Sequence, residues 1–144
     1  MLKHCIDPDY ITKALAEVRE AVDELESIVS RPIEEVLKAR ELRYAMRFCI
    51  ILIVESLADV AQHVLTRCFS EAPSSYIDAF VKLERVGLLS SSVVKELVSL
   101  ARLRNLIIHR YWVVDDARIY REARDRGVEI VREAMDLLRR ALDD

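Results

Sequence analysis

The residues from 104 to 112 concentrate side-chain types that suit phosphodiester chemistry; they read Arg-Asn-Leu-Ile-Ile-His-Arg-Tyr-Trp. A neutral imidazole such as that of His109 can take the proton from a ribose 2′-hydroxyl, and its protonated form can protonate a leaving oxygen. The Arg104 guanidinium can hold a phosphate through two parallel hydrogen bonds, and an aromatic ring can stack on an unpaired base. The segment therefore has the parts needed to cleave a phosphodiester bond.

The spacing of Arg104 and His109 sets a geometric condition. Positions five apart on an ideal helix differ by about 140° around its axis, so these two side chains do not converge on one face. Asn105 and His109 are four apart and do share a face, so the Asn105 amide can orient His109 or a phosphate oxygen. Either the helix ends before His109, or a second copy of the segment completes the site across a two-fold axis.

Plainer interpretations of the same residues stay open. A histidine near a helix end commonly caps or packs, and Arg102 and Arg110 can simply be surface charges. Tyr111 and Trp112 can plug the end of the fold, because large aromatic residues usually pack. From the residues alone, the segment is a candidate anion-binding site.

A second group of polar residues lies upstream. Glu55, Asp59 and His63 occupy positions i, i+4 and i+8 of an otherwise apolar stretch, so they form one stripe on a helix. The stripe is either a solvent-facing edge or a polar wall of a cleft.

The composition predicts the scaffold for these residues. The chain has 144 residues, of which 52% are hydrophobic and only 2 are Gly and 3 are Pro. A β-sandwich or barrel needs many more turn residues. We expect an all-α fold and a single domain over residues 1–144.

Punctuating residues and apolar spacing mark the helices of an up-and-down four/five-helix bundle. The first helix starts near Asp7-Pro8, with Asp9 as its cap, and ends at Arg31-Pro32. A short helix to Leu37 and a long helix from about 39 to 69 follow, and the long helix is apolar all round at Phe48–Val54. After a loop at 70–75, we expect a helix at 76–86 that is stopped by Gly87, and then a helix capped within Ser90–Ser92. The last expected helix runs from Asp115 or Asp116 to Leu142, with a bend at Gly127.

Charge and cysteines bear on partners and compartment. The net charge is −3, yet residues 99–112 hold three arginines and no acid, so a polyanion would be met locally. Cys5, Cys49 and Cys68 form no CxxC pair and no even framework, and Cys49 suits a core position. We expect a reduced, cytoplasmic protein without a signal peptide. The longest apolar run has seven residues, against about 20 needed to span a bilayer, so no membrane association is expected.

The motif Arg104-x4-His109-x-Tyr111 resembles the signature of the HEPN superfamily, and its surroundings look most like the HepT-type toxin branch. Leu42-Arg43-Tyr44, the Glu55/Asp59/His63 stripe, Ser75-Tyr76 and Val114-Asp115-Asp116 are similar as well. The resemblance covers roughly residues 10–142.

This resemblance implies a homodimeric, metal-independent endoribonuclease toxin that needs no cofactor. His109 would be the acid/base and Arg104 the phosphate stabiliser, with Asn105 in support and Glu55, Asp59 and His63 lining the cleft. Attack by the 2′-oxygen on an RNA substrate (tRNA or mRNA, not DNA) would leave a 2′,3′-cyclic phosphate. The implied partner is a small nucleotidyltransferase antitoxin that transfers AMP to Tyr111, and the added phosphate charge would repel RNA.

Two other functions compete with this one. A non-catalytic helical module could bind nucleotide or support a nucleotidyltransferase partner. A metal enzyme built on His4, His63 or His109 with the cysteines has no ligand spacing behind it.

Overall fold

The computed structural model describes residues 2–143 and is helical throughout, with no strand among those residues. The all-α prediction is therefore confirmed. The α-helices are α1 (Pro8–Val29), α2 (Ile33–Lys38), α3 (Arg40–Phe69), α4 (Tyr76–Arg85), α5 (Ser91–His109), α6 (Asp116–Glu122) and α7 (Val128–Asp143). Short 3-10 turns lie at Leu2–His4 and Tyr111–Val113, and a π-helical turn lies at Ala123–Gly127.

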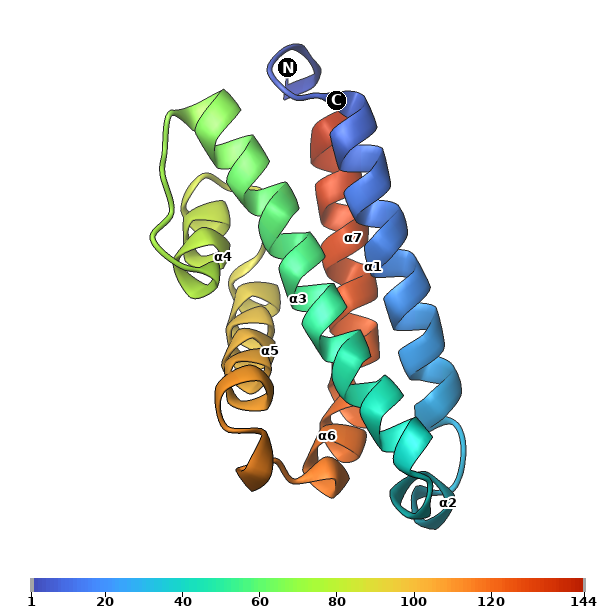
Figure 1. Cartoon of the computed structure of the whole chain (residues 1–144). Coiled ribbons are helices and arrows are strands. Elements are labelled where there is room, and N and C mark those ends of the chain that lie inside the picture. Colours follow the sequence, from blue (N-terminus) through green and yellow to red (C-terminus); the bar gives the residue numbers. More distant parts are fainter. Residues whose placement is uncertain (1, 144) are drawn as a thin grey trace.

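The four long helices α1, α3, α5 and α7 run alternately up and down (Figure 1). Helix α3 lies between α1 and α7 on one side and α4 and α5 on the other. It packs most extensively against α1 and also contacts α2, α4, α5 and α6. The predicted up-and-down bundle is confirmed, with α3 as its central member.

Local sequence explains why α1 starts and packs where it does. The apolar residues that recur along α1 at spacings of four and three are buried throughout: Ile11, Leu15, Val18, Val22, Leu25 and Val29. The cap is Asp7, not Asp9 as predicted, and its carboxylate accepts hydrogen bonds from the N–H groups of Asp9 and Tyr10. Pro8 takes the first helical position, where its missing N–H costs nothing, and this shifts the cap one residue before it.

The ends of α4 and the start of α5 lie at the capping and helix-stopping residues that the sequence indicates. Ser75 caps α4 and Ser90 caps α5, each through its hydroxyl. Gly87 adopts φ +83°, the left-handed conformation that glycine tolerates best, just after α4. These residues therefore fix where α5, the helix of the Arg-x4-His motif, begins.

The structure has a π-helical turn where a bend at Gly127 is predicted. The expected last helix divides into α6 and α7 around the π-helical turn, which ends at buried Gly127. A Cβ at Gly127 would lie 3.3 Å from the carbonyl oxygen of Glu122, so a larger residue would crowd the turn.

The N-terminal segment is fastened to the far end of α3. Cys5 and Cys68 form a disulfide, so the predictions that the cysteines make no framework and that the protein is reduced are both wrong for this pair. The Asp7 N–H donates to Nε2 of His63 over 2.9 Å, and the Tyr10 ring stacks on the His63 ring at 4.6 Å. Cys49 is buried as predicted, and burial raises the pKa of its thiol to about 11.

Helix α3 is long and apolar enough to cross a membrane by length and composition, but 61% of its most apolar window is buried inside the bundle. Packing against neighbouring helices therefore accounts for much of its apolar character. Most of the apolar stretch Phe48–Val54 is buried or half-buried, but Phe48 itself is 57% exposed and Tyr44, one turn earlier, is 56% exposed.

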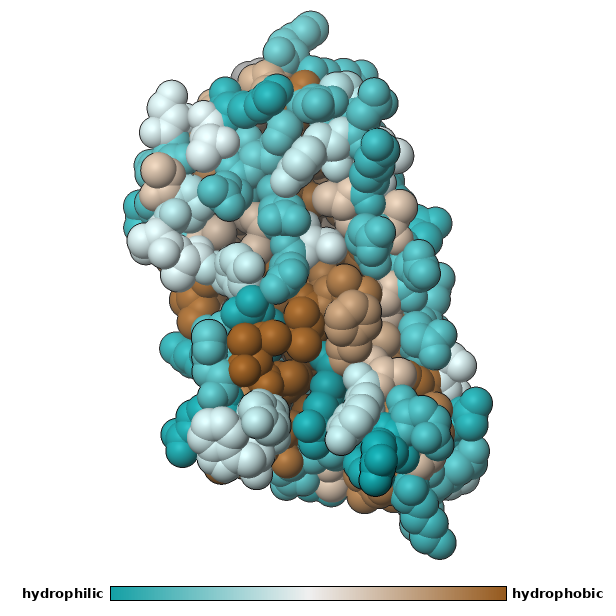
Figure 2. Space-filling model, in the orientation of Figure 1, coloured by the Kyte–Doolittle hydropathy of each residue, from teal (hydrophilic) through white to brown (hydrophobic). Residues whose placement is uncertain are grey.

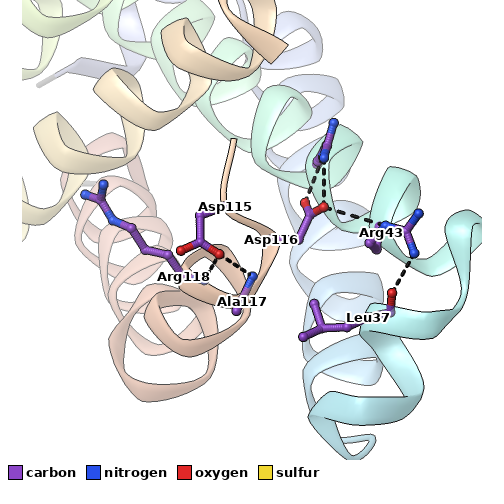
Figure 3. A network of polar contacts seen from close by, with 7 residues as sticks. Leu37, Arg43, Asp115, Asp116, Ala117 and Arg118 are labelled. Atoms are coloured by element: carbon purple, nitrogen blue, oxygen red, sulfur yellow. Dashed lines mark hydrogen bonds and ion pairs between the residues drawn. The ribbon is translucent and has the colours of Figure 1, made fainter. Parts of the chain in front are cut away.

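A network around Asp116 attaches the segment after α5 to α3 (Figure 3). Arg47 donates from Nε and Nη2 to the two carboxylate oxygens of Asp116 over 2.8 and 2.7 Å. Arg43 approaches the same carboxylate at 3.7 Å and donates to the Leu37 carbonyl oxygen over 2.6 Å. Next to it, Asp115 caps α6 by accepting from the Ala117 and Arg118 N–H groups. The path of the chain beyond the motif is thus fixed by the Asp116 side chain, which is only 11% exposed.

We expect Asp116→Ala to lower the free energy of unfolding by about 2–3 kcal/mol, because Arg47 would stay largely buried without its counter-charge. Urea denaturation measures this. Glu122→Ala is the matched control: it removes an exposed ion pair with Arg118 and should cost at most about 1 kcal/mol. Equal losses in the two variants would contradict a structural role for the Asp116 network.

The contact at His63 predicts a dependence of stability on pH. Its Nε2 accepts a hydrogen bond and must be unprotonated, and desolvation together with Arg67 lowers the pKa of His63 below 6.5, against a smaller opposing effect of Asp7. A histidine with a lowered folded-state pKa contributes stability that is complete above 6.5 and is lost as pH falls through its folded-state pKa.

His63→Gln should therefore lose less unfolding free energy than the wild type between about pH 7 and about pH 5. Asp59 acts in the opposite direction, because its raised pKa makes protonation stabilising at lower pH, but it is present in both proteins and cancels in the difference. Identical pH dependence in the two proteins would count against the His63 contact.

Candidate active site

Helix α5 carries Arg104 to His109 without interruption and ends at His109. Arg110 leaves the helical conformation, with φ −140° and ψ 47°, although its N–H still donates to the Leu106 carbonyl oxygen over 2.8 Å. The alternative in which the helix ends before His109 is therefore wrong. On this unbroken helix the two side chains project in directions about 140° apart.

Arg104 points into the bundle and is held by three other residues. Its Nη2 donates to Oε1 of Glu55 over 2.8 Å, and its Nη1 donates to Oδ1 of Asn105 over 3.0 Å. The guanidinium carbon lies 4.8 Å from the centre of the Tyr76 ring, within range of a cation–π interaction. The side chain is 15% exposed. Arg104 thus joins α5 to α3 and α4.

Asn105 supports a different residue from the one that helical spacing suggested. The sequence pairs it with His109 on one face, but its side-chain oxygen accepts from Arg104, its immediate neighbour. Asn105 therefore helps to fix the guanidinium.

His109 and Tyr111 lie at the surface. His109 is exposed at the end of α5, and Tyr111 and Trp112 are 63% and 66% exposed, with their rings in an edge-to-face contact at 5.3 Å. The interpretation that these aromatic residues plug the end of the bundle is wrong. The imidazole and the phenol are both open to a macromolecule that approaches from outside.

The Glu55/Asp59/His63 stripe divides between two places. Glu55 faces α5 through Arg104, whereas His63 contacts the start of α1. Asp59, between them, is exposed, and desolvation and the neighbouring Glu55 carboxylate raise its pKa. The structure brings only Glu55 of this stripe into contact with Arg104.

An exposed apolar surface accompanies these residues. It comes from the first half of α3, the last turn of α5 and the turn that follows, and we call it the aromatic face; its members are Tyr44, Phe48, Ile108, Tyr111, Trp112 and Val113. Figure 2 shows hydrophobic surface over α3 and α5 on this side of the molecule. Exposed apolar patches of this kind commonly mark a protein interface.

Two exposed arginines, Arg102 and Arg110, lie on the last turns of α5 and directly after it. Arg102 and Arg110 make no ion pair with any residue of the described chain, 2–143, whereas Arg104 is paired with Glu55. The positive charge available to a polyanion at this surface therefore comes mainly from Arg102 and Arg110.

Sequence reasoning missed Tyr76 and Asp116. In the sequence, Tyr76 enters only through the resemblance and as the start of a helix, and Asp116 only through the resemblance and as a possible cap, although they contact Arg104 and Arg47 respectively. Their partners lie 28 and 69 positions away in the sequence, and no local pattern links residues so far apart.

Comparisons with known proteins agree on one family. The family described as ribonuclease HepT-like matches residues 18–137. A curated relative, the tRNA nuclease HepT of Aphanizomenon flos-aquae, is 22% identical over 115 residues, which are 80% of this chain and 78% of the relative.

Solved structures share the fold. A tri-AMPylated HEPN toxin of Shewanella oneidensis, in complex with an MNT antitoxin, superposes with a TM-score of 0.84 at 17% identity, over 92% of this chain and 98% of that one. YutE of Bacillus subtilis, a cytosolic protein of unknown function, gives a TM-score of 0.83 at 16% identity, over 96% and 92%. At these identities the superpositions establish the helical architecture.

The predicted enzyme class, an endoribonuclease, is therefore confirmed at the level of the family. Because the family match spans most of the bundle and includes α5 with its Arg-x4-His motif, the chain belongs to the family described as ribonuclease HepT-like.

Proposed function

We propose that the chain is the toxin of a toxin–antitoxin pair and cleaves RNA as a homodimer, with Arg104 and His109 in the catalytic site. The observation that carries this proposal is the clamped guanidinium of Arg104 on the same helix as the exposed imidazole of His109, beside an uncovered apolar surface. The matched relatives support it: one is a tRNA nuclease, and another is a HEPN toxin in complex with an MNT antitoxin.

The proposed reaction needs no group beyond the side chains present. His109 takes the proton from a ribose 2′-hydroxyl, and the 2′-oxygen attacks the adjacent phosphorus. The bond from phosphorus to the 5′-oxygen breaks, and that oxygen receives a proton from an imidazolium. The products are a 2′,3′-cyclic phosphate and a 5′-hydroxyl. Arg104 stabilises the negative charge that builds on the phosphate oxygens during the attack.

A second copy of the chain solves the geometric problem set by α5. Within one copy, Arg104 turns towards α3 and α4 while His109 faces outward. A two-fold axis through the aromatic face would bring the same segment of both copies together. It would also supply two imidazoles, one to accept a proton and one to donate. Burying Phe48, Ile108 and Trp112 in this contact removes large apolar side chains from water.

The substrate follows from the chemistry. Attack by a 2′-oxygen requires ribose, so RNA is cleaved and DNA is not. Arg102 and Arg110 supply local positive charge on a chain whose net charge is −3. An RNA substrate, tRNA or mRNA, places the action of the protein in the cytoplasm.

Tyr111 is the proposed site of control by the antitoxin, a small nucleotidyltransferase. Tyr111 is 63% exposed and lies two positions after His109. Attack of the phenolic oxygen on the α-phosphate of ATP would form a tyrosyl-AMP ester and release pyrophosphate. The added phosphodiester charge would then stand at the position that an RNA phosphate needs, and like charges repel. The tri-AMPylated HEPN toxin among the matched structures supports this assignment.

Arg104→Ala and His109→Ala should each lower kcat for RNA cleavage by at least about 100-fold, because they remove charge stabilisation and proton transfer. Cleavage of purified tRNA and mRNA, together with growth of cells that express each variant alone, measures this. Arg140→Ala and His4→Ala are matched controls: both side chains are exposed and lie outside the motif.

Wild-type protein that leaves both RNAs intact and growth unchanged, like its two motif variants, would overturn the nuclease assignment. The chain would then be better described as a helical module that supports its nucleotidyltransferase partner.

Incubation with the antitoxin and ATP should raise the intact mass by one or more AMP units, and Tyr111→Phe should abolish the increase, because it removes the acceptor oxygen. Tyr44→Phe is the matched control, since the Tyr44 side chain is exposed to a similar degree, 56%. Mass spectrometry of peptides locates the group. AMP on another residue, with Tyr111→Phe labelled normally, would reject Tyr111 as the acceptor.

A further inference from the structure

The guanidinium of Arg104 is contacted by three elements of the bundle. Glu55 from α3 and Asn105 from α5 each accept one hydrogen bond at its edge, and the Tyr76 ring from α4 lies against its face. Its Nε is shielded from solvent and has no hydrogen-bond partner among the described residues. These contacts determine which N–H groups of the Arg104 guanidinium remain available to a substrate.

A count of donors shows what remains free. A guanidinium has five N–H bonds: one on Nε and two on each terminal nitrogen. One hydrogen of Nη1 goes to Asn105 and one of Nη2 goes to Glu55. The enclosed Nε is out of reach of a ligand. One hydrogen therefore remains on each terminal nitrogen, which is the number that an end-on, two-point contact with a phosphate requires.

We propose that Tyr76 and Glu55 are positioning residues that hold Arg104 for an end-on, two-point contact with the scissile phosphate. The inference rests on the proposed ribonuclease function and names residues through which Arg104 acts. Tyr76 supports the plane of the guanidinium, and Glu55 sets its rotation within that plane.

The ring of Tyr76 suits this task because its position is fixed locally. Ser75 caps α4 by accepting a hydrogen bond from the Asp78 N–H over 3.0 Å, and Asp78 accepts from the Ser74 N–H over 2.8 Å. Tyr76 is therefore the first residue of a helix whose start is doubly tied. The negative face of its π system also offsets part of the cost of enclosing a cation that is only 15% exposed.

Glu55 contributes geometry more than charge. Only its Oε1 contacts Arg104, and the Glu55 side chain remains 41% exposed. An uncharged oxygen in the same place would still accept the hydrogen bond from Nη2. A glutamine at position 55 should therefore preserve the orientation of Arg104, whereas an alanine should not.

The test uses two pairs of variants of the full-length chain, assayed for RNA cleavage with kcat and KM measured separately. Glu55→Ala and Tyr76→Leu should lower kcat by about tenfold or more, with KM changed by less than about threefold, because a misplaced guanidinium loses contacts made in the transition state. Glu55→Gln and Tyr76→Phe should stay within about threefold of the wild-type kcat. Gln62→Ala on α3 and Glu84→Ala on α4 are controls with exposed side chains.

A second measurement does not depend on activity. Hydrogen exchange of the Arg104 Nε–H, assigned in isotope-labelled protein by its loss in Arg104→Lys, should be slow in the wild type and in the Gln and Phe variants. It should accelerate in Glu55→Ala and Tyr76→Leu, because the enclosure opens. A merely destabilising substitution would instead raise exchange throughout the backbone.

Three outcomes would overturn the inference: wild-type kcat in Glu55→Ala and Tyr76→Leu, equal losses within each pair, or Nε–H exchange that is the same in all variants. Failure of the proposed function looks different. In that case the wild type itself does not cleave RNA, while the exchange measurement still decides whether Tyr76 and Glu55 enclose Arg104.

Discussion

A continuous helix carries both Arg104 and His109, and its pitch governs what one copy of this chain can do. With 3.6 residues per turn, one of the two side chains must turn inward when the other faces solvent. The inward one, Arg104, becomes part of the contact between α5, α3 and α4, so a group with a proposed role in chemistry also helps to join the bundle. The outward one, His109, depends on whatever approaches the surface.

Helix α3 organises these contacts at regular intervals. Arg47, Glu55 and His63 are eight residues apart along it, which corresponds to about 12 Å of rise between neighbours. Arg47 holds the segment beyond the motif, Glu55 holds Arg104, and His63 holds the start of α1. These three polar residues of α3 thus mark places where other elements attach, and each of the three contacts a different neighbour.

Much of the fold could be predicted from the sequence because helix ends depend on local chemistry. Pro8, Ser75, Gly87, Ser90 and Gly127 act on residues within a few positions of themselves, so their effects can be read without knowing the tertiary structure. Helix order and the irregularity at Gly127 followed from them, and the all-α fold class followed from the composition. The family-level function followed from the motif of α5. Long-range pairs left no such local trace: Cys5 with Cys68, Asp116 with Arg47 and Tyr76 with Arg104 all depend on how helices meet in space. The stripe on α3 showed a shared face correctly, but helix packing decided which neighbour each member contacts.

The segment from Arg110 to Asp115 has a mechanical consequence. It joins the end of α5 to the start of α6, and it is tied at one end by the backbone bond of Arg110 and at the other by the carboxylate of Asp116. A connecting segment this short, attached at both ends, has little conformational freedom. The most exposed aromatic residues of the described chain, Tyr111 and Trp112, therefore lie on a short segment that is attached at both ends, while their side chains remain open to solvent.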